Sequence, residues 1–301
     1  MDKRTLALLA AFCATTIYAL NHTIAKEVMP TYIQGLGFVQ LRLLGATVLF
    51  WLVSFFIRPQ RVLLRDFPHI LLCAFLGMVI NMLCFFKGIE YSTPINSAVL
   101  ITITPILVFV FSALLIKEKL LLPRVLGVLL GFAGAMVLVL FGQEIRQDAP
   151  NIPLGNILFV INATSFALYL VLVKSLSAKY TTVHLLKWLF LFGFVLSLPV
   201  TYKEFNAVAW GDLPFSAIWR FAFVVVGTTF LTYLFNVYAL KQLKASVIGV
   251  FTYLQPLIGI LYAIIVGADT LSITKFAGAV VVLSGVYLVT KKYPRFSQKG
   301  F

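Results

Sequence analysis

Residues 99–120 read VLITITPILVFVFSALLIKEKL, and residues 250–271 read VFTYLQPLIGILYAIIVGADTL. Both are apolar runs with a proline at the seventh position, so they align at a shift of 151 residues. The pairs matched at this shift are Val99 and Val250, Pro105 and Pro256, Glu118 and Asp269, Gly127 and Gly278, and Gly134 and Gly285. A shift of 148 residues aligns the starts of the two halves, pairing Thr16 with Thr164, Ala19 with Ala167, Lys26 with Lys174 and Gly45 with Gly193. The pattern indicates an internal repeat.

The composition places this repeat in a lipid bilayer. Hydrophobic residues make up 61% of the 301 residues, charged residues only 11%, and the mean hydropathy is +1.01. A water-soluble core cannot bury so much apolar surface. Long apolar runs in lipid must be helical, because each backbone has to satisfy its own hydrogen bonds. The net charge of +14 comes from short clusters between these runs, without a basic face or aromatic platform, so we expect no nucleic-acid partner.

Ten stretches approach the roughly 20 apolar residues that a spanning helix needs. The predicted spans are 6–25, 35–57, 68–89, 95–116, 124–141, 154–173, 183–202, 218–240, 246–266 and 274–290. Seventeen of the 24 Lys and Arg residues fall at the two chain ends and in every second connection. By the positive-inside rule both termini are cytoplasmic, and we expect a multi-pass protein of a bacterial inner membrane.

Each repeat holds five predicted spans, residues 1–146 and residues 147–301. Because five is odd, the second copy enters the membrane from the opposite face, and the two repeats are inverted. The predicted fold is thus all-α, with ten helices around a central cavity. Such mirrored halves can exchange conformations around a midplane site, opening it to one side and then to the other.

The sequence resembles the EamA-like branch of the drug/metabolite transporter superfamily. The resemblance rests on Arg42 in the second span and on the segment from Phe85 to Ala98, followed by Pro105 and then Lys117, Glu118 and Lys119. Tyr238, Ala239, Leu240, Ala245, Ser246, Pro256 and Gly278 repeat that signature. The resemblance implies a ten-helix basket and metabolite or amino-acid export. Tyr18 and Ala19 stand where the family usually has Trp and Gly.

Pro105 and Pro256 fall at corresponding positions within spans. Each removes one helix hydrogen bond and frees a carbonyl four residues earlier, at Ile101 or Thr252. A freed carbonyl can bind a solute or permit hinging, and the alternative is a static kink satisfied by a neighbouring helix.

Polar side chains within spans are the candidate substrate contacts, because lipid makes them expensive unless they meet water, substrate or each other. They are Asn21, Asn81, Thr102, Asn162, Tyr233, Asn236, Tyr253 and Gln255. Aromatic walls are expected from Tyr18, Phe85, Tyr169 and Tyr238. These amides and hydroxyls suit a polar uncharged or zwitterionic solute. For any single Asn, a hydrogen bond between helices is an equal alternative.

Arg42 is the basic residue buried within a span, and no carboxylate shares that span. It can bind an anionic group, although a peripheral arginine bonded to carbonyls or reaching the interface is the favoured interpretation. No span carries a central Asp or Glu, which weakens a carboxylate proton relay.

The sequence offers no catalytic or cofactor set. His22, His69 and His184 lie near span ends without metal spacing, and Cys13, Cys73 and Cys84 have no paired spacing. Glycines in the fifth and tenth spans indicate close helix packing, with weak dimerisation as the second possibility. We therefore expect a secondary transporter of small organic solutes, without cofactor or metal, acting as a monomer or weak homodimer. A membrane-embedded enzyme or a receptor is the alternative.

Overall fold

The computed structural model describes residues 2–26, 28–92, 94–118, 121–140, 150–265 and 272–291. Asp269, which the shift of 151 residues aligns with Glu118, lies outside these residues. Within them, nine helical stretches are long and apolar enough to cross a membrane, and a shorter apolar helix covers Val99–Leu115. Their large apolar side chains are widely exposed on the outer surface, as lipid contact requires.

The first half runs from α1 to α7. Its elements are α1 (Lys3–Lys26), α2 (Gly35–Phe55), η1 (Leu64–Asp66), α3 (Phe67–Ala74), η2 (Phe75–Ile80), α4 (Asn81–Tyr91), α5 (Pro94–Ile101), α6 (Thr104–Leu115) and α7 (Leu122–Leu140). The second half has the elements α8 (Ile152–Lys179), α9 (Thr182–Asn206), η3 (Trp210–Asp212), α10 (Phe215–Ala222), η4 (Phe223–Leu231), α11 (Thr232–Gln242), α12 (Ala245–Val250), η5 (Phe251–Tyr253), α13 (Leu254–Ile265) and α14 (Ile273–Thr290). Elements η1 to α4, α10 to α11 and α12 to α13 each form one uninterrupted helical stretch.

Irregular backbone occurs at corresponding places in the two halves. Element η2 and element η4 are both π-helical and begin 148 residues apart. A second irregularity precedes each aligned proline: α5 ends at Ile101 and α6 begins at Thr104, while the 3-10 turn η5 separates α12 from α13. Because proline lacks an amide proton and crowds the preceding turn, it interrupts the helix just before it. The two halves thus share their helical irregularities as well as their apolar runs.

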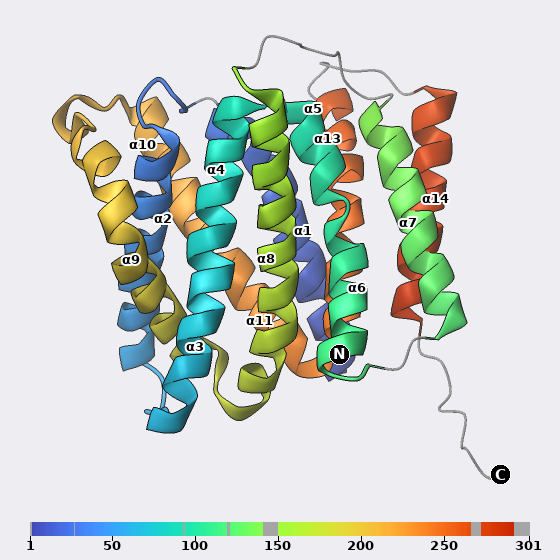
Figure 1. Cartoon of the computed structure of the whole chain (residues 1–301), viewed down its shortest axis with the longest axis horizontal. Helices are drawn as coiled ribbons and strands as arrows, with labels where there is room; N and C mark the ends of the chain where they lie inside the picture. The colour runs from blue at the N-terminus through green and yellow to red at the C-terminus, as the bar shows by residue number, and fades with distance from the viewer. Residues whose placement is uncertain are drawn as a thin grey trace.

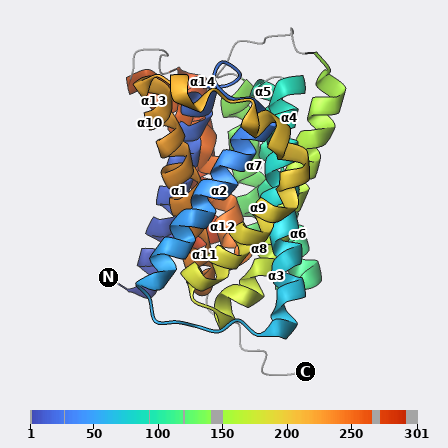
Figure 2. The ribbon, with the colours of Figure 1, turned by 90° about the vertical axis from the view of Figure 1, so that its left-hand side faces the viewer.

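Helices of the two halves pack against each other in reciprocal pairs. Helix α2 packs on α9, α7 on α14, α1 on α11, and α4 on α8. Figure 1 shows α7 and α14 together at one edge, α2 and α9 toward the other, and α1 and α8 between them. The view turned by 90° shows the same helices running along the height of the molecule (Figure 2). The core therefore lies between the halves, not inside either one.

The contact between α7 and α14 depends on glycine. A Cβ added at Gly285 would come within 2.5 Å of the Gly131 amide nitrogen and 2.6 Å of the Gly127 carbonyl oxygen. A Cβ at Gly134 would meet the Gly278 carbonyl oxygen at 2.9 Å. The expected close packing is confirmed, and because it joins two helices of one chain, these glycines are not exposed for a dimer contact.

The beginning of α1 and the end of α14 lie at the same end of the molecule. Arg4 donates a hydrogen bond from its guanidinium to the carbonyl oxygen of Thr290 at 2.5 Å. At this end Glu118 also accepts from the Ser246 hydroxyl and lies 3.4 Å from the Lys244 amine. These contacts join the helix ends of the first half to those of the second.

Candidate functional site

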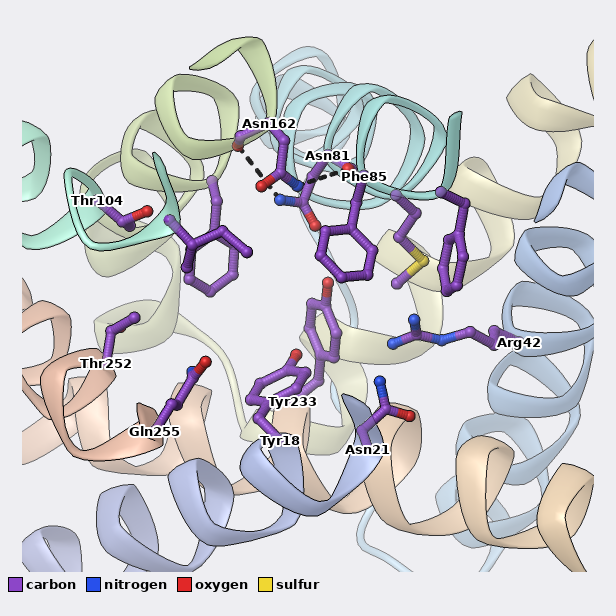
Figure 3. Close-up of a pocket in the computed structure, with 14 residues that line it drawn as sticks. Tyr18, Asn21, Arg42, Asn81, Phe85, Thr104, Asn162, Tyr233, Thr252 and Gln255 are labelled. Atoms are coloured by element: carbon purple, nitrogen blue, oxygen red, sulfur yellow. Dashed lines mark hydrogen bonds between the residues drawn. The ribbon is translucent and has the colours of Figure 1, made fainter. Parts of the chain in front are cut away.

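A cavity of about 100 Å³ lies in the core between the two halves. Its wall combines polar and aromatic side chains from α1, α2, α4, α8, α11 and the two interrupted helices. The lining residues are Tyr18, Asn21, Arg42, Asn81, Met82, Phe85, Phe86, Ile101, Thr104, Asn162, Phe166, Tyr233, Thr252 and Gln255. Figure 3 shows Tyr18 and Asn21 on one side of this pocket and Asn81 and Asn162 on the opposite side. The arrangement can surround a small solute with both hydrogen-bonding and aromatic groups.

Eight lining residues form four pairs related by the shifts found in the sequence. The shift of 148 relates Tyr18 to Phe166 and Phe85 to Tyr233, and the shift of 151 relates Ile101 to Thr252 and Thr104 to Gln255. Each pair contributes one residue from each half of the chain. The pocket is thus built by equivalent positions of the two halves.

The two interrupted helices line this pocket at their breaks. Ile101 and Thr252, whose carbonyls the sequence predicts to be freed by the prolines, both line it. In the first break the Thr102 and Ile103 amides instead donate to carbonyls three residues earlier, each at 3.2 Å. Such tightened turns leave the preceding helical hydrogen-bond pattern incomplete beside the cavity.

Asn81 and Asn162 hold α4 and α8 together at the cavity wall. The Asn162 side-chain amide donates to the Asn81 carbonyl oxygen at 2.7 Å, and the Asn81 amide donates to the Asn162 carbonyl oxygen at 3.3 Å. Their amide groups therefore have an interhelical role. Gln255, in contrast, extends from α13 toward the cavity (Figure 3).

Arg42 differs from the expectation of a peripheral arginine. Its side chain is 4% exposed, and Figure 3 shows the guanidinium reaching from α2 into the pocket. Its Nε donates to the Thr229 hydroxyl at 2.9 Å, and one terminal nitrogen lies 3.5 Å from the Thr228 carbonyl oxygen. The guanidinium carbon stands 5.5 Å from the centre of the Phe86 ring. These contacts orient a positive charge toward the cavity.

Five of the predicted contact and wall residues lie outside the pocket lining. Thr102 sits in the first break, where its hydroxyl donates to the Val99 carbonyl oxygen at 2.5 Å. Tyr169 packs its ring over Gly77, and Tyr253 packs over Gly131. Asn236 is half-buried on α11 without lining the cavity. Tyr238, expected in an aromatic wall, is 36% exposed on the surface.

Four lining residues escaped the sequence reasoning because they are apolar or stand beside a proline. They are Met82, Phe86, Thr104 and Phe166. Helical spacing contains the missing signal: Phe166 follows Asn162 by four positions, and Phe86 follows Met82 by four, so each pair shares one helix face. Spacing from a polar anchor would have identified Phe166.

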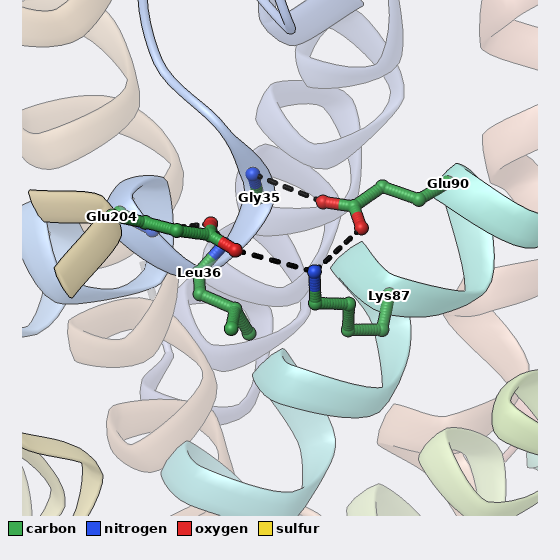
Figure 4. A network of polar contacts seen from close by, with 6 residues as sticks. Gly35, Leu36, Lys87, Glu90 and Glu204 are labelled. Carbon is green, nitrogen blue, oxygen red and sulfur yellow. Dashed lines mark hydrogen bonds and ion pairs between the residues drawn. The ribbon is translucent and has the colours of Figure 1, made fainter. Parts of the chain in front are cut away.

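A partly buried ionic network joins the start of α2 to the ends of α4 and α9 (Figure 4). The Lys87 amine lies 2.6 Å from Glu90 and 3.2 Å from Glu204. Glu204 also accepts from the Leu36 and Gly37 amides at 2.7 and 3.2 Å, while Glu90 accepts from the Gly35 amide at 3.2 Å. Two carboxylates thus satisfy the first amide donors of α2, where the helix dipole favours negative charge.

Comparison with known proteins shows the family to which this chain belongs. The model of the EamA-like transporter family matches residues 5–140 and residues 153–291. An uncharacterized transporter of Archaeoglobus fulgidus is 25% identical over 95% of this chain and 98% of its own length. In Bacillus subtilis, the uncharacterized transporter YetK is 26% identical over 84% of this chain and 78% of its own length.

The fold is also found among solved structures. One crystal structure has a TM-score of 0.78 with this chain at 17% identity, covering 94% of this chain and 96% of the other. The likeness shows a shared fold. With family matches over both halves and relatives named as transporters, the chain belongs to the EamA-like transporter family and is a multi-pass membrane transporter.

Proposed function

We propose that this protein is a secondary carrier that exports small organic solutes, metabolites and amino acids included, by alternating access. The observation that carries the proposal is the set of four repeat-related residue pairs around one cavity. A site shared equally by two similar halves can be exposed on either side when the halves exchange conformations. The helix breaks before Pro105 and Pro256 are the proposed hinges of this exchange.

The proposed topology has ten spans in two inverted repeats, residues 1–146 and 147–301. It is supported by the two separate family matches and by the reciprocal packing of α1 on α11 and α4 on α8. The hydrogen bond between Arg4 and Thr290 supports an even number of crossings. The Lys and Arg excess supports cytoplasmic termini in a bacterial inner membrane. We further propose that the carrier works as a monomer or at most a weak homodimer.

The test is solute flux in liposomes that contain the purified protein. A carrier gives saturable, solute-selective uptake that protein-free liposomes lack, and preloading with a transported solute accelerates uptake by exchange. A receptor or an enzyme would bind a solute without moving it. Watertight proteoliposomes that move no member of a metabolite library would contradict the proposal.

A further inference from the structure

The two halves of the chain contribute equivalent positions to the pocket, but they do not contribute equal charge. Arg42 is the charged residue of its described lining, and the shift of 148 relates it to Phe190 in the second half. Phe190 is fully buried away from the lining, with its ring centre 5.2 Å from that of Phe50. One half of the chain therefore supplies a charge to the shared cavity and the other half supplies none.

In the part of the chain that the structure describes, this charge has no counter-ion. Among the described residues, no carboxylate forms an ion pair with Arg42, and the cavity lining contains no acidic residue. The acidic residues that the structure describes lie at the ends of helices, as the network of Lys87, Glu90 and Glu204 does. A buried, unpaired cation in lipid is costly, and a bound anion removes that cost.

The geometry around Arg42 leaves donors for such an anion. A guanidinium has five N–H donors, and the contacts to Thr229 and Thr228 engage two of them. In the described part of the chain, the remaining donors have no hydrogen-bond acceptor, and the guanidinium faces the cavity (Figure 3). Two of these N–H groups can hold a carboxylate in a bidentate pair.

We propose that Arg42 binds the carboxylate of an organic monoanion, and that the pocket selects monoanions over zwitterions and cations. The inference rests on the proposed function and narrows its substrate class: of the small organic solutes proposed there, organic monoanions are preferred over zwitterionic amino acids. A monoanion brings the net charge of the occupied site to zero. A zwitterion leaves the site with one uncompensated positive charge, and a cation adds a second. The aromatic rings of Tyr18, Phe85 and Phe166 provide the apolar wall for the organic part.

The test compares three probes of nearly the same shape and different charge. They are 2-hydroxy-3-methylbutanoate, its neutral amide, and the zwitterion valine, with inorganic phosphate and chloride as anions that lack an organic part. Binding to the full-length protein in lipid nanodiscs is measured by calorimetry, independently of flux. We expect the hydroxy acid to bind at least about tenfold more tightly than valine or the amide. Valine binding equally well or better, or no binding of the hydroxy acid at millimolar concentration, would overturn the inference. Equal binding of chloride or phosphate would also overturn it.

Variants assign the selectivity to Arg42. Arg42→Gln should weaken binding of the hydroxy acid at least about 30-fold and leave the amide unchanged, while Arg42→Lys should retain part of the affinity. Arg124→Gln is the matched control, because Arg124 is a buried arginine that lies 3.8 Å from Glu118 and outside the cavity lining. Thr229→Val keeps the charge and removes only one supporting hydrogen bond, so it should keep the preference for the anion.

The outcomes separate the two proposals. Selective monoanion binding without flux supports the substrate class and contradicts the carrier. Flux of zwitterions or cations without monoanion preference supports the carrier and contradicts the substrate class. Unchanged hydroxy-acid binding in Arg42→Gln contradicts the role of Arg42.

Discussion

The polar residues that line this pocket differ in what their side-chain groups contact. Asn81 and Asn162 exchange hydrogen bonds across the contact between α4 and α8, while Gln255 extends toward the cavity from α13. Both groups looked alike in the sequence, as amides within apolar runs. Their different surroundings predict different consequences of substitution.

Asn162→Ala should reduce the stability of the folded protein by about 0.6–1.7 kcal/mol, because it removes the 2.7 Å hydrogen bond to the Asn81 carbonyl. Gln255→Ala should leave stability nearly unchanged and reduce flux. Thermal unfolding in detergent and uptake into liposomes measure the two effects. A Gln255→Ala protein that loses folded protein and flux in equal measure would assign Gln255 to packing instead.

At the scale of elements, helix ends and helix contacts determine which parts of the molecule are rigid. Glycines let the backbones of α7 and α14 come into direct contact, so close packing holds this pair of helices in place. The ends of α2, α4 and α9 are joined by charges that exchange partners more readily. We expect rigidity at the first contact and conformational change at the second.

Gly285→Ala should destabilise the protein by about 1–3 kcal/mol or more, because the new Cβ would meet backbone atoms of α7 at 2.5 and 2.6 Å. Gly259→Ala is the matched control, since a Cβ at that helical glycine meets nothing within 4 Å. The melting temperatures of the two variants compare the effects. Equal destabilisation would show that steric contact with α7 is not the cause.

Glu204→Gln should open the cavity toward the network that Glu204 forms with Lys87 and the start of α2. The substitution weakens charge-assisted bonds to Lys87 and to the Leu36 amide, so labelling of a cysteine at position 82 from that face should rise at least about fivefold. The measurement uses Met82→Cys in a protein whose native cysteines are replaced by serine, with a membrane-impermeant thiol reagent.

The control for that experiment breaks an ion pair at the opposite end of the same helical stretch, Leu64–Tyr91. The Lys179 amine lies 3.1 Å from Asp66 there, and Lys179→Gln should leave labelling from the face of Glu204 unchanged. Equal labelling in the Glu204→Gln and parent proteins would exclude the network as a gate.

At the scale of the whole molecule, equivalent helices of the two halves run through the membrane in opposite directions if the repeats are inverted. Helix α7 begins at Leu122 and α14 begins at Ile273, and the shift of 151 residues relates these two exposed positions. Their positions relative to the membrane faces therefore test the inversion directly.

Leu122→Cys and Ile273→Cys should react with an impermeant thiol reagent from opposite faces. In the proposed topology the Leu122 site is reached from the cytoplasm and the Ile273 site from outside, because an odd number of spans separates them. Inside-out and right-side-out vesicles of the cysteine-substituted protein measure the two accessibilities. Labelling of both sites from one face would contradict the inverted repeats and, with them, alternating access between mirrored halves.

Much of the fold follows from local properties of the sequence. The predicted second span begins at Gly35, where α2 begins, and the predicted last span ends at Thr290, where α14 ends. Apolar runs produce helices in lipid whatever their neighbours, and proline interrupts a helix through its own ring, so the positions of both breaks follow from the sequence. The positions of these helix ends and of the two proline breaks are thus determined by the sequence alone.

The site depended on tertiary structure. The sequence favours a peripheral Arg42 and a substrate contact at Tyr253, yet Arg42 reaches the cavity and Tyr253 packs against Gly131. Likewise, nothing local brings Lys87 to Glu204, which lies on another helix. A sequence determines that a segment is helical, but the rotation of each helix and its choice of neighbour depend on how side chains from distant segments fit. Which polar groups meet in the cavity was therefore decided only when the two halves packed together.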